Sequence, residues 1–445
     1  MRPLELKLFV GALACVTCAT SARAQETTPA TQPTETWAVH AQMTFETQGV
    51  LGFHAPYQGP NSLTPNRIKE TFDSTISLGL RPWAGAETWV NGEIDQGFGL
   101  SNTYGVAGFP SAEAYKVGKA NPYFKFHRAF LRQTVSLGGT VAHVDAAANQ
   151  LAGSQTAERV VLTLGKFGAP DIFDTNRYAH DPRADFMNWA AVDAGTFDYA
   201  ANAWGYSYGA AAEYYHVNWT VRAGIFNLSV IPNGIELETN LSQNQILAEL
   251  EHRHTLNGHA GAIKVTYFRN HGKFSRFNDA LALAATTGQP LDLSLTRRPQ
   301  NRNGLHVNIE QELTNTLGVF ARAGVADGAI EPYDFTDIDQ SILVGGALKG
   351  KGWHRTDDTI GLAVILNSIS HDHQAYLAAG GLGTLVGDGK LPHPGNEAIV
   401  EAYYAWHTPI KHLDMTFDYQ FIANPGYNRD RGPANVLAIR LHAAI

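Results

Sequence analysis

The sequence predicts an all-β fold, a 16-stranded antiparallel transmembrane β-barrel of the outer membrane, from three observations. An export signal precedes a series of stretches of about ten residues that alternate apolar with polar side chains. The joins between these stretches are alternately short and long, as in barrels with tight periplasmic turns and longer outward loops. The predicted strands cover about 37–50, 71–81, 86–95, 128–137, 159–167, 204–215, 218–227, 245–254, 261–270, 302–313, 317–325, 340–348, 359–366, 397–407, 412–421 and 435–445.

The first 24 residues have the pattern of a cleavable signal peptide. A basic start leads into the apolar run 8–19, and residues 22–24 (Ala-Arg-Ala) supply the small side chains that a signal peptidase accepts. Both cysteines, Cys15 and Cys18, lie in this segment, so the mature chain is expected to form neither a disulfide nor a thiolate metal site.

Residues 25–36 read as a disordered periplasmic lead-in, which leaves 37–445 for the barrel. The formal net charge is −8, and loss of the basic signal makes it more negative, which argues against nucleic acid as a partner. No motif requires a cofactor.

Residues 415–421 show how the strands divide between lipid and water. The Met, Phe and Tyr side chains share one face, whereas Thr416, Asp418 and Gln420 share the other. A soluble sheet with one wet face would alternate in the same way, but a single sheet of sixteen strands would curl or split. A barrel this wide cannot fill its lumen with strand side chains, so the polar inward face predicts a water-filled lumen.

The stretch 204–215 adds an aromatic signal. Trp204, Tyr206, Tyr208 and Tyr214 share the parity assigned to lipid, and aromatic residues near strand ends are typical of the interfacial girdle of a barrel. One join departs from the pattern, because 138–158 should be periplasmic and yet is long.

Five long, irregular segments spread over nearly the whole mature chain carry a family resemblance. They are Leu80–Gly99, Gly165–Arg183, Asp193–Gly209, His373–Gly389 and Asp418–Pro433. These segments resemble the carbohydrate-selective porin family of Gram-negative bacteria, the OprB type. The resemblance implies a 16-stranded barrel without enzymatic activity and diffusive uptake of sugars such as glucose.

The same resemblance implies partners other than the sugar. These are the lipid and lipopolysaccharide of the outer membrane and the barrel-assembly machinery, while the formation of homotrimers is left open. Barrels of this kind usually end in an aromatic residue, whereas this chain ends in Ile445, which has the parity of the lipid face.

The predicted strand 86–95 offers the sharpest candidate for a sugar-passing constriction. Strand parity places Trp89, Glu93 and Asp95 on one inward face. A sugar exchanges its water hydrogen bonds for carboxylate or amide partners and can lay its ring on an aromatic plane. A parity error of one residue would instead make Trp89 an interfacial anchor.

Other predicted strands place arginines on their inward faces: Arg132, Arg222, Arg322 and Arg440. A guanidinium group offers a fixed fork of donors that suits vicinal hydroxyls, or a carboxylate across the lumen such as Glu93 or Asp418. The alternative is that these arginines form salt bridges that only stiffen the wall.

The join 168–203 is too long for a turn and is the third outward join. Its charged residues are Asp171, Asp174, Arg177, Asp181, Arg183 and Asp185. Because the third outward loop of general porins folds into the lumen, we expect this segment to narrow the channel, with 96–127 as a second candidate. The aspartates could alternatively bind Ca²⁺ through their oxygen atoms.

Two short motifs admit other functions. Residues 205–209 (GYSYG) match the nucleophile elbow of α/β-hydrolases but lie in an alternating aromatic strand, which favours coincidence. His371-Asp372-His373 could bind a metal, although a solvated surface position is favoured. A barrel-embedded hydrolase, a general channel and a sugar-binding surface protein are therefore the alternatives to a sugar channel.

Overall fold

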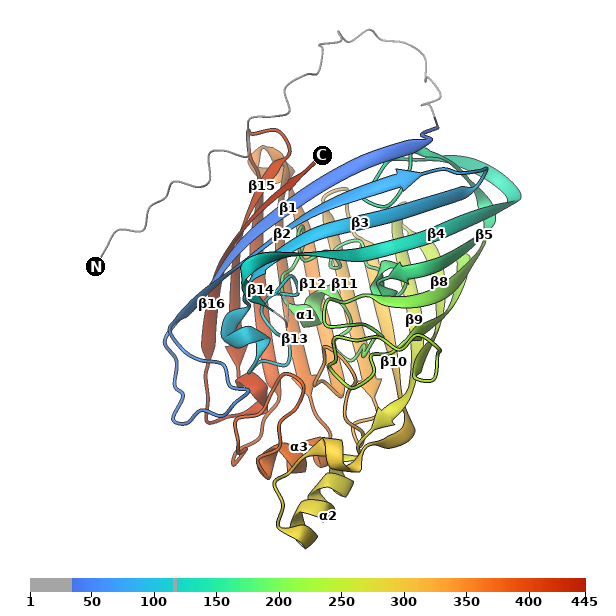
Figure 1. The fold of residues 1–445 in the computed structure, drawn as a ribbon. Helices are drawn as coiled ribbons and strands as arrows, with labels where there is room; N and C mark the ends of the chain where they lie inside the picture. The colour runs from blue at the N-terminus through green and yellow to red at the C-terminus, as the bar shows by residue number, and fades with distance from the viewer. Residues whose placement is uncertain (1–33, 115–117) are drawn as a thin grey trace. The chain divides into compact units, whose positions relative to one another are not determined.

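The computed structural model describes residues 34–114 and 118–445, and in it sixteen strands form one closed barrel (Figure 1). Each strand pairs antiparallel with its neighbours in the sequence, and β1 closes the barrel on β16. The strands are β1 (Trp37–Val50), β2 (Arg67–Leu80), β3 (Ala86–Gly97), β4 (Lys119–Val144), β5 (Gly153–Phe167), β6 (Ser207–His216), β7 (Trp219–Asn227), β8 (Asn244–Leu256), β9 (His259–Phe274), β10 (Arg298–Glu312), β11 (Leu317–Ala326), β12 (Gln340–Gly350), β13 (Arg355–Ser368), β14 (Glu397–His407), β15 (Leu413–Ala423) and β16 (Ala434–Ala444). The predicted fold class is confirmed, whereas the predicted signal peptide 1–24 lies outside the described residues.

The alternation of side chains across the wall also matches the sequence. Thr416 and Asp418 are buried inside the barrel, whereas Phe417 between them is 45 % exposed on the outside. Tyr208 and Tyr214 of β6 also face outward, where an aromatic girdle would lie. Among the described residues, no helix is both long enough and apolar enough to cross a membrane.

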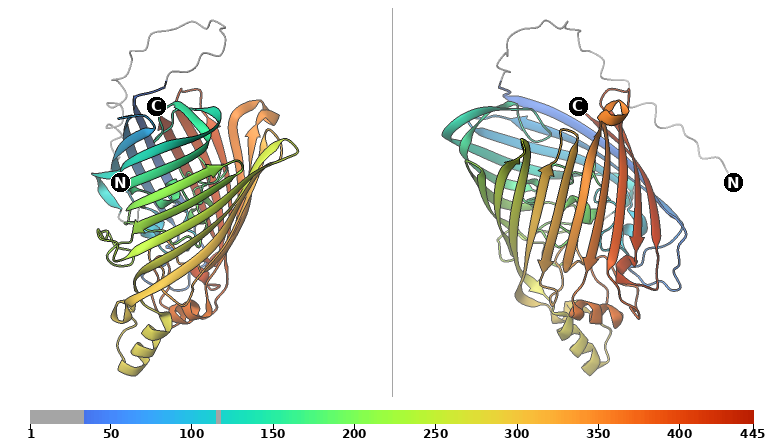
Figure 2. Two further views of the ribbon diagram at one scale, coloured as in Figure 1. Left: turned by 90° about the vertical axis from the view of Figure 1, so that its right-hand side faces the viewer. Right: turned by 180° about the vertical axis from the view of Figure 1, so that it is seen from behind.

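The joins at the two ends of the barrel differ as predicted. The long joins gather at the end that carries α2 (Phe277–Thr287) and α3 (His371–Ala378), and the tight turns lie at the other end (Figures 1 and 2). By the usual asymmetry of outer-membrane barrels, the first end is extracellular and the second periplasmic. The remaining helical turns are α1 (Trp189–Val192), η1 (Leu100–Thr103), η2 (Ala169–Asp171), η3 (Leu293–Thr296), η4 (Lys351–Trp353) and η5 (Pro425–Tyr427).

The β4–β5 hairpin corrects two predicted joins. Pairing continues to Val144 opposite Gly153, so the long periplasmic join shrinks to 145–152, and β4 starts early enough to reduce the join 96–127 to 98–118. The register shifts beside Gly138 break the alternation within β4. The alternation of apolar and polar residues therefore predicts that the strand ends at that point, although the backbone pairing continues.

The structure contradicts the prediction of a water-filled lumen, because loops fill much of the lumen. The described part of segment 98–118 and the whole of 168–206 fold between the walls. Phe186 of the second segment packs against Phe320 of β11 and Tyr403 of β14, with ring centroids 5.4 and 4.9 Å apart. The strand side chains alone could not fill a barrel of this width, but two inward loops supply the missing volume.

The motif at 371–373 is part of the packing of the outer loops. His373 Nδ1 lies 3.1 Å from Asp339 Oδ2, and the imidazole ring stacks on Phe277 with centroids 4.4 Å apart. The expectation of a solvated surface position is therefore wrong for His373, which joins α3 to α2 and to the β11–β12 loop.

Candidate functional site

Loop 168–206 is held inside the barrel through Asp174. Arg322 of β11 contacts the Asp174 carboxylate at 3.2 Å and donates to the Ala191 carbonyl at 2.6 Å. Asn308 donates to Asp174 Oδ1 at 2.7 Å, and Glu249 accepts from the Asp174 N–H at 2.8 Å. Burial acts to raise the pKa of Asp174, but the charge of Arg322, together with His306 and the hydrogen bonds from Ala194 and Asn308, lowers the pKa overall. Arg322 therefore serves chiefly to anchor the loop.

Further inward side chains bind the backbone of the same loop. Glu401 accepts from the Met187 N–H at 2.5 Å, and Glu310 accepts from the Arg177 N–H at 2.8 Å. Arg440 donates to the Asp185 carbonyl at 3.0 Å. The prediction that the third outward loop folds into the lumen is confirmed, and the polar inward faces of distant strands satisfy its buried backbone.

Loop 98–118 is fixed by inward side chains of β14 and β1. Glu397 of β14 accepts from the Ala107 and Gly108 N–H groups at 3.0 and 2.8 Å. Ser111 Oγ donates to Glu46 of β1 at 2.9 Å. Both predicted constriction loops thus lie inside the barrel.

A β-bulge in β4 brings two polar side chains to the space between these loops, here called the passage. His127 is the extra residue opposite Asn91 and Gly92 of β3. Because a bulge opposes two residues to one, His127 and Arg128 both face the lumen despite being adjacent in sequence. Two consecutive polar residues inside an alternating strand signal such a bulge, but the predicted strand began only at 128 and excluded this signal.

Arg128 forms the strongest ion pair of the passage. Its Nε and Nη2 atoms donate to the Asp171 carboxylate at 2.8 and 2.6 Å, and its Nη1 donates to Tyr206 Oη at 3.3 Å. Burial acts to raise the pKa of Asp171, but the charge and hydrogen bonds of Arg128, with the hydrogen bond from the Gly168 N–H and the nearby His180, lower the pKa overall, so the carboxylate stays charged. The pair presents both signs of charge beside an aromatic ring.

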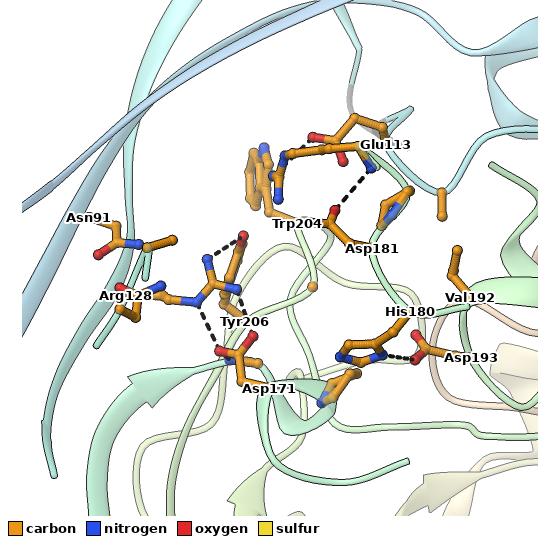
Figure 3. A pocket seen from close by; sticks show the side chains of 18 of the residues that line it. Asn91, Glu113, Arg128, Asp171, His180, Asp181, Val192, Asp193, Trp204 and Tyr206 are labelled. Atoms are coloured by element: carbon orange, nitrogen blue, oxygen red, sulfur yellow. Dashed lines mark hydrogen bonds and ion pairs between the residues drawn. The ribbon is translucent and has the colours of Figure 1, made fainter. Parts of the chain in front are cut away.

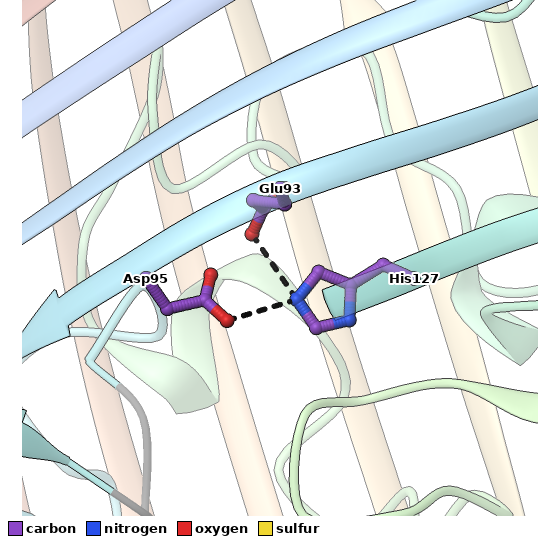
Figure 4. Close-up of side chains that lie close together, drawn as sticks. All are labelled: Glu93, Asp95 and His127. Atoms are coloured by element: carbon purple, nitrogen blue, oxygen red, sulfur yellow. Dashed lines mark hydrogen bonds and ion pairs between the residues drawn. The ribbon is translucent and has the colours of Figure 1, made fainter. Parts of the chain in front are cut away.

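Glu93, Asp95 and His127 form a cluster behind Arg128 (Figure 4). His127 Nε2 lies 3.5 Å from Glu93 Oε1 and 3.2 Å from Asp95 Oδ2, and its ring stacks on Tyr206 with centroids 4.7 Å apart. The ligand atoms all lie within 4.8 Å of one another, which makes this the one cluster among the described residues that could share a metal ion. The predicted inward orientation of Glu93 and Asp95 is confirmed.

The passage opens into a cavity of about 290 Å³ between the two loops and the β2–β4 wall (Figure 3). This volume holds roughly ten water molecules at ~30 Å³ each. Arg183 of loop 168–206 meets Glu113 of loop 98–118 across the cavity at 3.0 Å. The polar and aromatic residues that line it include Asn91, Glu113, Arg128, Asp171, His180, Asp181, Arg183, Asp193, Trp204 and Tyr206.

Trp204 and Tyr206 do not belong to the aromatic girdle in which they were predicted. Strand β6 begins at Ser207, so the parity of the strand does not extend to these two residues. Trp204 Nε1 donates to Tyr123 Oη at 2.9 Å, and Tyr206 stacks on His127 inside the barrel. The match of residues 205–209 (GYSYG) to the nucleophile elbow is a coincidence. Ser207 is the first residue of a strand and donates its hydroxyl to the Asn227 carbonyl.

Trp89 points inward as predicted but does not line the cavity. Its ring is 1 % exposed and stacks on His40, and it covers Gly79, where a Cβ would lie 2.4 Å from the indole. Its Nε1 donates to Glu87 Oε2 at 3.2 Å. We expected Trp89 beside segment 168–203. It instead packs on β1 and β2, because the missing side chain at Gly79 leaves room for the indole.

The other predicted arginines have local partners. Arg222 contacts Glu249 and Glu251, both at 2.7 Å, and Glu213 at 2.9 Å. Arg132 donates to the Asn149 carbonyl at 2.9 Å and lies 3.5 Å from Glu87. The interpretation of wall-stiffening salt bridges therefore describes Arg222 well.

The remaining candidates also have local hydrogen bonds. Asp418 accepts from Gln420 at 3.1 Å. The Asp181 carboxylate accepts from the Arg183 N–H at 2.9 Å. In the part of the chain that the structure describes, the aspartates of loop 168–206 do not converge as a calcium site would require.

His180 and Asp193 lie next to each other in the lining of the cavity as a neutral pair (Figure 3). Their closest atoms are 3.7 Å apart. Burial lowers the pKa of His180, and burial together with the charge of Asp174 raises the pKa of Asp193 to about 8. Asp193 is therefore mostly protonated at neutral pH and gains a negative charge in mildly alkaline solution.

This titration predicts a pH-dependent ion preference. The preference for cations over anions should rise between about pH 7 and about pH 9, because the pKa of Asp193 is about 8 and its ionisation adds negative charge to the cavity. The reversal potential in a salt gradient measures this change, and Asp193→Asn should flatten it. An unchanged pH response in Asp193→Asn would assign the effect to other groups.

A closed barrel with two inward loops and a polar, charged cavity between them is an outer-membrane channel. Residues 61–444 match the carbohydrate-selective porin, OprB family, and the chain belongs to this family. It is thus a porin of the Gram-negative outer membrane that takes up sugars, and its family and fold are those of a channel rather than an enzyme.

Solved structures support the same fold. The high-pH structure of Pseudomonas putida OprB superposes with a TM-score of 0.70 at 18 % identity and covers 92 % of this chain and 94 % of its own. The low-pH structure of the same protein gives a TM-score of 0.50 at 13 % identity and covers 92 % and 93 %. No curated protein sequence matches the chain.

Proposed function

We propose that this porin passes monosaccharides such as glucose, and that the cavity between loops 98–118 and 168–206 holds the sugar in transit. The observation that carries the proposal is the pairing of opposite charges on both sides of the passage. Arg128 and Asp171 stand on one side and Arg183 and Glu113 on the other, with Tyr206 beside the first pair.

The chemistry of these groups suits a neutral polyol. Each hydroxyl of a sugar is both donor and acceptor, so it can accept from a guanidinium and donate to the adjacent carboxylate. Because the groups are already paired, a sugar exchanges existing hydrogen bonds rather than filling vacant ones. Its net binding energy is therefore small, which suits a channel that must also release its solute.

The cavity also favours a single sugar ring. Arg128 and Asp171 keep part of their side chains accessible, while the loops enclose the remaining space. A second ring would have to displace anchored loop backbone, at the cost of buried hydrogen bonds. Glu93, Asp95 and Asp181 support the site from positions next to these two pairs.

Proteoliposomes that contain the protein should swell several-fold faster in glucose than in a disaccharide, since the narrowest diameter and its polar lining decide permeation. An uncharged polyether of glucose size serves as the control for size alone. Equal swelling in all solutes of one size would contradict sugar selectivity and support a general channel.

We further propose that the chain is exported through cleavage after residue 24 and is inserted by the barrel-assembly machinery next to lipopolysaccharide. The signal-like pattern of 1–24 and the lipid-facing apolar band support this. Sequencing the N-terminus of the membrane-extracted protein tests the cleavage, and its mass in detergent distinguishes a monomer from a homotrimer.

A further inference from the structure

The periplasmic turn 145–152 between β4 and β5 bends into the barrel. Its residues 147–150 line a cavity of about 630 Å³ together with Asp171, Thr175 and His180 of loop 168–206. Ala148 and Asn149 of the turn also line the smaller sugar cavity. Residues of a periplasmic turn and of an extracellular loop therefore border the same spaces.

The turn also reaches the opposite part of the periplasmic rim. Ala148 lines a third cavity together with His412 of the β14–β15 turn and Ala444 of β16. These residues belong to strands on the far side of β1 from the β4–β5 hairpin. The turn thus extends across part of the periplasmic mouth.

A group of polar contacts fixes the turn in this position. Glu87 Oε2 accepts from the Leu151 N–H at 3.4 Å and from Trp89 Nε1 at 3.2 Å. Arg132 donates to the Asn149 carbonyl at 2.9 Å, and Glu35 accepts from the Ala152 N–H at 2.7 Å. Leu151 is 1 % exposed. An anchored backbone with a buried apolar side chain has a defined place, unlike a turn in solvent.

We propose that the turn 145–152 is a second narrowing of this channel, on the periplasmic side of loop 168–206. The larger cavity is then a chamber between two constrictions, lined by Arg132, Arg159 and Tyr215. Trp89 and Glu87 act as positioning residues for the inner constriction. The proposal rests on the proposed function only in that the solute crossing both constrictions is a sugar.

Thiol modification of the turn tests the inner constriction. The two native cysteines lie in the predicted signal segment, so single cysteines can be introduced into a thiol-free mature chain. In Ala148→Cys, a cationic methanethiosulfonate reagent added from the periplasmic side should lower the single-channel current by roughly a third or more, because the adduct enters the path of the ions.

Asp145→Cys is the matched control in the same turn. The Asp145 side chain is 91 % exposed and lines none of the three cavities that Ala148 lines, so modification there should leave the current unchanged. Mass spectrometry establishes that both variants are labelled. Full labelling of Ala148→Cys without a change in current, or an equal change in Asp145→Cys, would overturn the proposal.

A second variant tests the anchoring without a chemical label. Arg132→Ala removes the hydrogen bond to Asn149 and should raise the open-channel current and speed disaccharide entry, whereas Arg355→Ala at another periplasmic turn should change neither. A current at the wild-type level in Arg132→Ala would contradict the role of Arg132.

The thiol test is independent of the proposed sugar selectivity, because it measures ion current without sugar. It can therefore support the inner constriction even where the swelling experiment shows no sugar selectivity.

Discussion

Replacing loop 168–206 with a short turn should raise the single-channel conductance at least about twofold and abolish the preference for monosaccharides, because the loop occupies space inside the lumen. Phe167 and Ser207 are register partners at the ends of β5 and β6, so a linker of roughly four residues can join them. The deletion also removes Asp171 and Arg183 from the sugar cavity.

Replacing loop 275–297 with a linker of the same length provides the control. Phe274 and Arg298 are likewise paired, and this loop carries α2, which projects from the extracellular end of the barrel (Figure 1). The control should conduct like the wild type. Both proteins must first show a strand-dominated circular dichroism spectrum and migrate faster unboiled than boiled. A folded 168–206 variant with wild-type conductance would show that this loop does not limit permeation.

Breaking the Arg128–Asp171 pair should weaken the block of ion current by glucose by roughly tenfold or more in Arg128→Ala. A hydrogen bond to a charged group contributes about 1.5–3 kcal/mol, and each 1.4 kcal/mol is a factor of ten in affinity. Arg128→Lys should recover only part of the block, because an ammonium group keeps the charge but lacks the planar fork. Titration of glucose against single-channel current measures each variant.

Arg355→Ala is the matched control for this experiment. It removes another two-bond contact between an arginine and an aspartate, Arg355 with Asp358 at 2.9 and 3.1 Å, near a periplasmic turn. Asp171→Asn and the double variant complete a double-mutant cycle, which should show coupling because the two side chains touch. Sugar block at the wild-type level in Arg128→Ala would remove Arg128 from the binding site.

The placement of the aromatic residues shows where a local pattern stops being informative. Parity correctly oriented Tyr208 and Tyr214, which lie within β6, but it failed for Trp204 and Tyr206, which precede the strand. The bulge at His127 likewise interrupts the period, so the inward position of His127 could not be assigned by counting, whereas Arg128 keeps the parity of Arg132. Parity is reliable only where the ladder is regular.

The sequence by itself determined the strands, the closed barrel, the lipid-facing side and the polar lumen, because an alternation of period two is a property of neighbouring residues. It also indicated that loop 168–206 turns inward. Only the tertiary structure decided which groups meet there. Asp174 lies 148 residues from Arg322, and Glu401 lies 214 residues from Met187. The inward course of the turn 145–152 depends in the same way on Glu87 and Arg132, which belong to other segments of the chain, and local alternation carries no information about such pairs.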